Sequence, residues 1–172
     1  MLVRSMMTDI IIGIDPGAVS GAYSVLTRDG KFCLCNDFPI KDKMIDGKKL
    51  ADDLDNIIKA TGEASAILEH VNAMPGQGVC SSFNFGQGFG IIKGVLDAFE
   101  IDYDLVRPAK WKKALHLDRE AETSLCLARE LYPDSQSFLK RKKDHNRAEA
   151  ILLAHYWLVT NEGGHELNVS KR

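Results

Sequence analysis

The chain of 172 residues is 45% apolar and 27% charged, and its formal net charge is −2. This length is typical of one domain with a substantial core, so we expect a single domain over residues 1–172. The apolar content excludes a disordered chain, and the lack of an apolar run of about 18 residues excludes a membrane span. The near-neutral charge excludes a uniformly basic domain, so any nucleic acid would have to be bound by local basic clusters.

The start of the chain and its cysteines indicate a reducing location. Only about eight residues precede the first apolar run, Ile10–Ile14, too few for the charged, apolar and cleavage regions of a signal peptide. We therefore expect a cytoplasmic protein. Cys33 and Cys35 alternate in an expected strand, so they would point to opposite faces and not share a metal ion. The cysteines are expected to be reduced and structural.

The first half of the chain predicts three antiparallel strands and a return to a parallel fourth. Residues 8–15, TDIIIGID, form a buried apolar strand. Residues 21–38 form two strands joined around Asp29-Gly30, the strongest hairpin signal in the chain. Residues 46–60 carry apolar side chains at helical spacing, and the short apolar run ASAILEH then forms a strand that ends at Glu69.

The second half begins with a loop rich in Gly and Ser, VNAMPGQGVCSS. The elements expected after it are a helix over Phe85–Phe99, a strand over residues 102–108, a short helix opened by Pro108, a helix over residues 118–131 and a closing helix from Asp144 to about Thr160. This order predicts an α/β fold with a mixed five-stranded sheet, three antiparallel strands then two parallel strands, flanked by helices.

Two carboxylates lie where neighbouring strands are expected to end. Asp15 either caps the turn after its strand or binds a metal ion, and Gly17 and Gly21 would leave bare backbone for a ligand. Glu69 follows three apolar residues, and because an unpaired buried charge is costly, a metal, Arg107 or solvent must satisfy it. Strand ends converge in open α/β sheets, so Asp15 and Glu69 are expected to share one site.

The closing helix offers further ligands. His145 and Glu149 are four residues apart and therefore lie side by side. Asp144 lies about 140° around an ideal helix from Glu149 and is a candidate N-cap, although its oxygen atoms suit magnesium. Both Asp144 and His145 are candidates for the third ligand, and His145 is alternatively a general base that activates water.

Carboxylates around divalent ions suit phosphodiester cleavage, in which one ion activates water and another stabilises the leaving oxygen. Such a site needs cations nearby to hold the phosphates of a nucleic acid. Two basic clusters are the candidate DNA-binding residues, and they comprise Arg107, Lys110, Lys112, Lys113, Lys140, Arg141, Lys142, Lys143 and Arg147.

The other histidines and a glycine repeat are expected to have mainly structural roles or to lie at an interface. His70 is expected to be structural or to support a metal ligand, His155 to be a hydrogen-bonded core residue, and His116 and His165 to be exposed. A bare stripe with a period of four residues is formed by Gly86, Gly90 and Gly94. The stripe indicates either close packing within the chain or a homodimer interface.

Five segments, in the same order, resemble the RuvC-like Holliday junction resolvases of the RNase H superfamily, particularly their phage and prophage members. The segments are GIDPGAVSGAYSV, ILEHV, FNFGQGFGIIKGVL, VRPAKWKKAL and KKDHNRAEAILLA, which span nearly the whole chain. GIDPG alone also resembles the phosphate loop of actin-like ATPases. Those proteins need two such domains and a second phosphate loop, for which 172 residues have no room.

The resemblance implies a single RNase H-like nuclease domain and the activity of a crossover junction endodeoxyribonuclease. Such an enzyme would resolve four-way DNA by paired symmetric nicks, with Mg²⁺ as cofactor and Mn²⁺ as a substitute. It implies a homodimer that binds branched DNA in the cytoplasm of a bacterial or phage-infected cell. By this resemblance, the four metal-site residues of the family correspond to Asp15, Glu69, Asp144 or His145, and Glu149.

The chain departs from this family at several positions. Glu149 stands where members mostly have Asp, and Asn146 stands where bacterial members often have an acid. Asn72 replaces the aromatic wedge that opens the junction in bacterial resolvases. Met74 or Phe83 could supply an apolar wedge, and Phe83 could equally belong to the core.

Two rival functions stay open on the sequence. The same acidic constellation does not encode the sugar, so an RNase H-like nuclease that cuts RNA or an RNA/DNA hybrid is one alternative. The unusual Glu149 and Asn146 leave room for a catalytically silent module that binds branched DNA.

Overall fold

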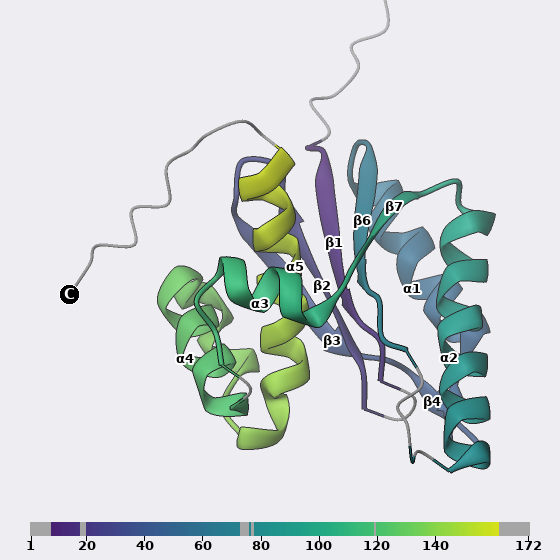
Figure 1. The fold of residues 1–172 in the computed structure, drawn as a ribbon. Coiled ribbons are helices and arrows are strands. Elements are labelled where there is room, and N and C mark those ends of the chain that lie inside the picture. Colours follow the sequence, from purple (N-terminus) through teal and green to yellow (C-terminus); the bar gives the residue numbers. More distant parts are fainter. Residues whose placement is uncertain (1–7, 18–19, 73–75, 77, 119, 162–172) are drawn as a thin grey trace, which may run out of the picture.

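The computed structural model describes residues 8–17, 20–72, 76, 78–118 and 120–161 (Figure 1). They form a five-stranded sheet in the order β3-β2-β1-β6-β7. Its strands are β1 (Ile10–Asp15), β2 (Ala22–Thr27), β3 (Phe32–Asp37), β6 (Ala64–Glu69) and β7 (Asp102–Val106). The predicted mixed sheet is therefore confirmed.

The strand directions also match the prediction. β1, β2 and β3 pair antiparallel, with Ile10 opposite Thr27 and Val25 opposite Leu34. The β2–β3 turn contains Gly30, whose φ of 84° lies in the left-handed region that favours glycine. β6 pairs parallel to β1, and β7 pairs parallel to β6. The carboxyl ends of β1, β6 and β7 therefore lie at the same edge of the sheet.

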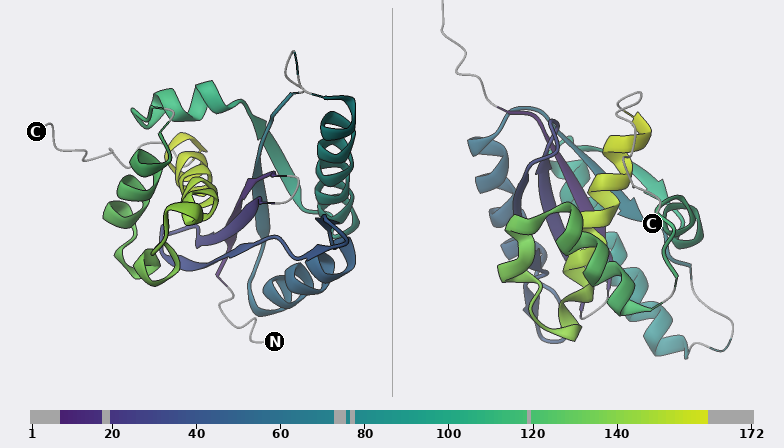
Figure 2. Two further views of the ribbon diagram at one scale, coloured as in Figure 1. Left: turned by 90° about the horizontal axis from the view of Figure 1, so that it is seen from below. Right: turned by 90° about the vertical axis from the view of Figure 1, so that its left-hand side faces the viewer.

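Helices cover both faces of the sheet (Figure 2). One layer holds α1 (Gly47–Ala60) and α2 (Val79–Ala98), and the other holds α3 (Pro108–Ala114), α4 (Ala121–Leu131) and α5 (His145–Asn161). Side chains of β1 alternate between the two cores, because Ile11 packs on the α3–α5 side whereas Ile10 and Ile12 pack on the α1–α2 side. Among the described helices, none is long and apolar enough to cross a membrane.

Three local features differ from the sequence expectation. A small hairpin of β4 (Ile40–Lys41) and β5 (Met44–Ile45) precedes α1. Helix α2 begins at Val79, inside the expected loop. The sequence pattern missed this first turn because its residues are exposed and lack the apolar periodicity that marks a buried face. Two 3₁₀ segments, η1 (Pro133–Phe138) and η2 (Lys142–Asp144), precede α5.

The cysteine prediction is confirmed for strand β3. Cys35 is fully buried and Cys33 is exposed, so the two point to opposite faces of the sheet. All four cysteines are free. Burial raises the pKa of Cys35 to about 12, which keeps this thiol protonated and unreactive near neutral pH.

Candidate metal centre and nucleic-acid face

Asp15 and Glu69 are the last residues of the neighbouring parallel strands β1 and β6. The register pairs Ile14 with Leu68, so the two carboxylates follow adjacent positions at the same sheet edge. Glu69 is itself paired with Val106 of β7. The sheet thus brings both acids to one place, as expected from converging strand ends.

Helix α5 brings a third carboxylate because it packs directly on β1. A Cβ atom at Gly13 would lie 2.0 Å from the carbonyl oxygen of Ala150, so only glycine permits this approach. The Ser24 hydroxyl of β2 donates to the same Ala150 carbonyl at 2.9 Å. Glu149, the residue before Ala150, is therefore held at the level of the ends of β1 and β6.

The three acids form one electrostatic cluster, here called the acid cluster (Asp15, Glu69 and Glu149). Burial raises the pKa of Asp15 well above its ordinary value, and the charges of Glu69 and Glu149 raise it further. Lys112 opposes this shift. Among the described residues no side chain donates a hydrogen bond to Asp15. The turn that Asp15 was expected to cap includes residues 18 and 19, which lie outside the described residues. The charged form of Asp15 would need a cation nearby.

Helix α3 supplies the partners of the other two acids. Trp111 Nε1 donates to Glu69 Oε1 at 2.8 Å, and Lys112 Nζ donates to Glu149 Oε1 at 2.7 Å. Ser124 of α4 donates to the same Glu149 oxygen at 3.1 Å. Burial raises the pKa of Glu69, and the indole hydrogen bond opposes that shift.

These contacts decide whether the cluster could hold a metal ion. As the side chains stand, no group of three or more His, Cys, Asp or Glu residues within the described ranges is arranged to hold one. Lys112 is the positive group that lies against the cluster instead. The donor chemistry still fits a hard divalent cation, because three carboxylates interact electrostatically and no side chain of the described residues donates to Asp15.

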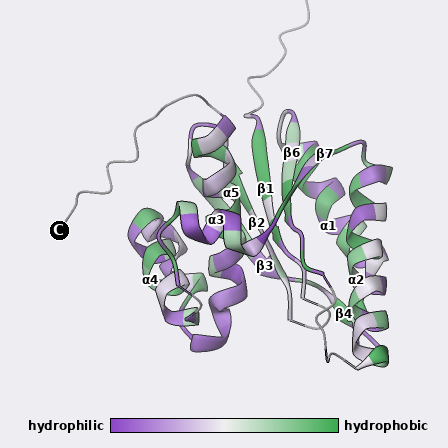
Figure 3. Ribbon diagram, viewed as in Figure 1, coloured by the Kyte–Doolittle hydropathy of each residue, from purple (hydrophilic) through white to green (hydrophobic). Residues whose placement is uncertain are grey.

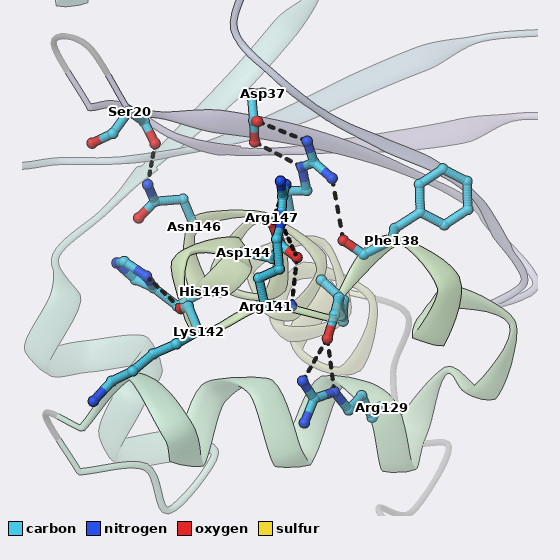
Figure 4. Close-up of polar contacts among 11 residues, drawn as sticks. Ser20, Asp37, Arg129, Phe138, Arg141, Lys142, Asp144, His145, Asn146 and Arg147 are labelled. Atoms are coloured by element: carbon cyan, nitrogen blue, oxygen red, sulfur yellow. Dashed lines mark hydrogen bonds and ion pairs between the residues drawn. The ribbon is translucent and has the colours of Figure 1, made fainter.

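Asp144 is bonded to Arg141 (Figure 4) and is not among the charged groups that act on Asp15 or Glu69. It is 3% exposed and accepts from the Arg141 backbone amide at 2.8 Å and from Arg141 Nη2 at 2.8 Å. Burial alone would raise its pKa, but the hydrogen bonds from Arg141 outweigh burial and lower it. It closes the capping box of η2 and does not cap α5. These bonds hold the Asp144 carboxylate beside η2.

His145 and Asn146 begin α5 beside Asp144. His145 is half-buried, and its Nδ1 lies 3.2 Å from the Lys142 carbonyl oxygen. His145 is one helical turn before Glu149, but it is not among the charged groups that act on Asp15 or Glu69. The Asn146 amide donates to the Ser20 carbonyl and so ties α5 to the segment after β1 (Figure 4).

The nine basic candidates fall into two groups. Three are engaged within the chain: Lys112 with Glu149, Arg141 with Asp144, and Arg147 with Asp37 through two bonds of 2.7 Å. The other six are exposed and have no ion pair within the part of the chain that the structure describes, and they are Arg107, Lys110, Lys113, Lys140, Lys142 and Lys143.

Helix α3 lies beside the acid cluster, because its Trp111 and Lys112 bond to Glu69 and Glu149. Figure 3 colours α3 and the first turns of α5 as hydrophilic, and both elements border the site. A cleft of about 770 Å³ runs along α3, and Lys112, Lys113 and His116 line it. Lys112 therefore both lines this cleft and donates to Glu149 of the acid cluster.

Sequence reasoning missed two residues that shape the site. Trp111 carried a usable signal, since a buried indole N–H needs an acceptor. Ser124 is a fully buried polar residue on a helix, and nothing in the sequence pairs it with Glu149. Arg107 was one candidate partner for Glu69, but it is exposed and Trp111 takes that place.

The glycines near the site and on α2 differ in their surroundings. Cβ atoms at Gly17 and Gly21 would lie 2.6 and 2.3 Å from backbone nitrogens of each other, so only glycines allow these two segments to pass so close. The stripe of Gly86, Gly90 and Gly94 does not pack against any described part of the chain, because added Cβ atoms there would meet nothing within 4 Å.

The wedge candidates and the remaining histidines differ in burial and in their contacts. Phe83 is 65% exposed and is not a core residue. His70 is half-buried and stacks on Phe89, and His116 is exposed. His155 bonds to the Tyr132 hydroxyl through Nδ1 at 2.8 Å, but its buried Nε2 has no partner in the described residues. The wedge candidate Met74, the adjoining Pro75 and His165 lie outside the described residues.

Known Holliday junction resolvases resemble this chain in part of its sequence and in its fold. No protein-family model matches the chain. The chloroplastic Holliday junction resolvase MOC1 of Chlamydomonas reinhardtii is 33% identical over 85 residues, which are 47% of this chain and 9% of that protein. The chain thus spans a small part of the length of this relative.

Solved structures resemble the chain over nearly its whole length. RuvC of T. thermophilus in complex with a Holliday junction substrate matches with a TM-score of 0.64 and 12% identity over 90% of this chain and 96% of that one. The fowlpox virus Holliday junction resolvase matches with a TM-score of 0.58 and 16% identity over 88% and 98%. At these identities the likeness establishes the fold, and the chain therefore has the RuvC-like form of the RNase H-like fold.

Proposed function

We propose that the chain is a metal-dependent, structure-selective endonuclease that resolves four-way DNA junctions by paired symmetric nicks. The observation that carries this proposal is the acid cluster, in which the ends of β1 and β6 and a turn of α5 present three carboxylates on one face. A RuvC-like fold around such a cluster favours junction cleavage over other phosphodiester chemistry.

The acid cluster would hold Mg²⁺, with Mn²⁺ as a substitute, through Asp15, Glu69 and Glu149. When bound, divalent ions would activate water and stabilise the leaving oxygen. His145 is one turn from Glu149 and is proposed as a base or an additional ligand. Asp144 is proposed to hold the start of α5 through Arg141, not to bind metal.

The exposed cations are proposed to hold the DNA backbone. Lys110 and Lys113 belong to α3, whose Trp111 and Lys112 contact the acid cluster, and Lys140, Lys142 and Lys143 precede α5, which carries Glu149. Phosphates bound by both groups would be drawn across the cluster, whose own negative charge otherwise repels DNA. Lys112 would be released from Glu149 once a metal supplies the positive charge.

A homodimer is proposed through the outward face of α2. Val79 and Phe83 are 85% and 65% exposed, and they share this face with Gly86, Gly90 and Gly94. An apolar end followed by a bare glycine stripe allows close approach of a second helix. A C₂ dimer would present two like sites to the two strands of a junction.

Asp15→Asn tests the proposal directly. The substitution removes one metal ligand and should lower the cleavage rate more than about 100-fold, the upper end of the loss for a merely supporting residue. Junction binding without metal should persist, because the basic residues are unchanged. Cleavage of a mobile four-way junction, linear duplex and RNA/DNA hybrid should be compared in Mg²⁺ and in Mn²⁺.

The substrate panel also separates the rival functions. If the RNA/DNA hybrid were cleaved in preference to the junction, the chain would be an RNase H-like nuclease and not a junction resolvase. Tight junction binding without products in either metal would make the chain a binding module. Wild-type nicking by Asp15→Asn would show that the acid cluster is not the metal centre.

A further inference from the structure

A buried hydrogen bond joins the acid cluster to the hydrophobic core. Trp111 is fully buried, and its Nε1 donates to Glu69 Oε1 at 2.8 Å. Glu69 is itself 6% exposed, so both partners are shielded from water. A buried indole N–H that lost this acceptor would be left unsatisfied, which makes the contact a strong determinant of the Glu69 rotamer.

The chain path fixes the distance between the two side chains. Glu69 pairs with Val106 in the sheet, and α3 begins two residues after Val106. The His70 amide donates to the Val106 carbonyl at 2.7 Å, which anchors the ends of β6 and β7 to each other. Pro108 opens α3 and sets its direction, so Trp111 in the first turn is carried back over Glu69.

The hydrogen bond divides the two oxygens of Glu69 between different tasks. Oε1 is held by the indole, whereas among the described residues no donor is bonded to Oε2. The donor is neutral, so it orients the carboxylate without cancelling its charge. Glu149 differs, because its partner Lys112 is a cation that competes with a metal.

We infer that Trp111 is a positioning residue that holds Glu69 through Oε1 and leaves Oε2 directed to the divalent ion of the acid cluster. This inference rests on the proposed metal centre. It assigns the basic segment of α3 a second role beside DNA contact, since consecutive residues Trp111 and Lys112 hold two different carboxylates.

The chain contains a matched control for this role. Trp157 is also largely buried, and its Nε1 donates to Asp104 Oδ2 at 2.9 Å. That bond joins α5 to β7 and involves no residue of the acid cluster. Trp111→Phe and Trp157→Phe therefore each remove one indole donor to a carboxylate, and only the first should affect metal binding.

Metal binding without DNA is the primary measurement. Binding of Mn²⁺ to the full chain should be followed by isothermal titration calorimetry and by the loss of the electron paramagnetic resonance signal of free Mn²⁺. Trp111→Phe should weaken binding about 10- to 100-fold, as expected for loss of a residue that orients a ligand, and Trp157→Phe should leave it unchanged. Wild-type binding by Trp111→Phe would overturn the inference.

A double variant shows whether Trp111 acts through Glu69. In the Glu69→Gln background, Trp111→Phe should cause no further loss of Mn²⁺ affinity. An equal loss in both backgrounds would mean that Trp111 acts through general packing, which also overturns the inference. Both readouts are independent of cleavage, so a positive result would stand even if no DNA substrate were cut.

Fluorescence provides a test that does not need Trp111 to be replaced. In Trp157→Phe, Trp111 is the remaining tryptophan of the two in the chain. Paramagnetic Mn²⁺ at the acid cluster should quench it at the concentration at which calorimetry detects binding. Absence of quenching at saturating Mn²⁺ would place the metal elsewhere and refute the assignment.

Discussion

Replacing Lys112 with Met removes the cation that lies against the acid cluster and retains a similar aliphatic stem. The Lys112 and Glu149 side chains are 20% and 12% exposed, so the pair is mostly shielded from solvent. Breaking a fully buried pair by loss of one partner costs about 3–5 kcal/mol. Because Ser124 still donates to Glu149, we expect a loss of about 2–3 kcal/mol in metal-free buffer near neutral pH.

The loss should depend on metal and on pH. A shift of about 2–4 °C in Tm per kcal/mol predicts that Tm falls by about 4–12 °C. Mg²⁺ should restore more stability to Lys112→Met than to the wild type, because the ion replaces the missing positive charge. Acid should also reduce the difference, since Asp15 and Glu69, whose pKa values are raised, become neutral first.

Urea denaturation in EDTA and in Mg²⁺, at several pH values, measures these effects. Lys113→Met is the matched control, because Lys113 is exposed and has no ion pair within the described part of the chain. Equal losses for the two variants, or a loss in Lys112→Met that neither Mg²⁺ nor acid reduces, would refute the role of Lys112 as counter-ion.

Three further predictions test the site and its surroundings. Without metal at neutral pH, Asp15→Asn should have a higher free energy of unfolding than the wild type. The folded-state pKa of Asp15 is raised, so the wild type loses stability as the pH rises through that pKa. The gain measured by urea denaturation should therefore vanish at acidic pH, where Asp15 is neutral. Changing Lys142 and Lys143 to Ala should weaken junction binding and reduce the salt slope, from filter or fluorescence titrations, by about one unit per lost phosphate contact. Phe83→Asp should shift the sedimentation coefficient from that of a dimer to that of a monomer. Asn84→Asp is the control on another face of α2 and should leave the dimer intact. A wild-type chain that sediments as a monomer would rule out the α2 interface.

Local sequence patterns determined the framework of this fold. The apolar runs, the Asp29-Gly30 turn and helical spacing predicted the mixed sheet that the structure contains. They also placed Asp15 and Glu69 at adjacent strand ends, because parallel strands of one sheet end at the same edge. These signals are readable since periodicity records which face of an element is buried.

Periodicity could not decide what each buried or exposed face meets. Asp144 and Glu149 are equally acidic in the sequence, yet one closes a local box with Arg141 and the other joins the acid cluster. The glycine stripe of α2 left both packing within the chain and a homodimer interface open, and only the structure shows that added Cβ atoms on this face would meet nothing in the described chain within 4 Å.

The sequence by itself determined which elements form and where the strand-end acids stand. Tertiary structure alone decided their partners. Lys112 meets Glu149 across 37 residues, and Trp111 meets Glu69 across 42. Such contacts depend on how α3 folds back over the sheet edge, and no local rule relates the identity of one partner to the other. The physical reason is that a side chain's charge or donor is a local property, whereas its pairing is set by the packing of distant elements.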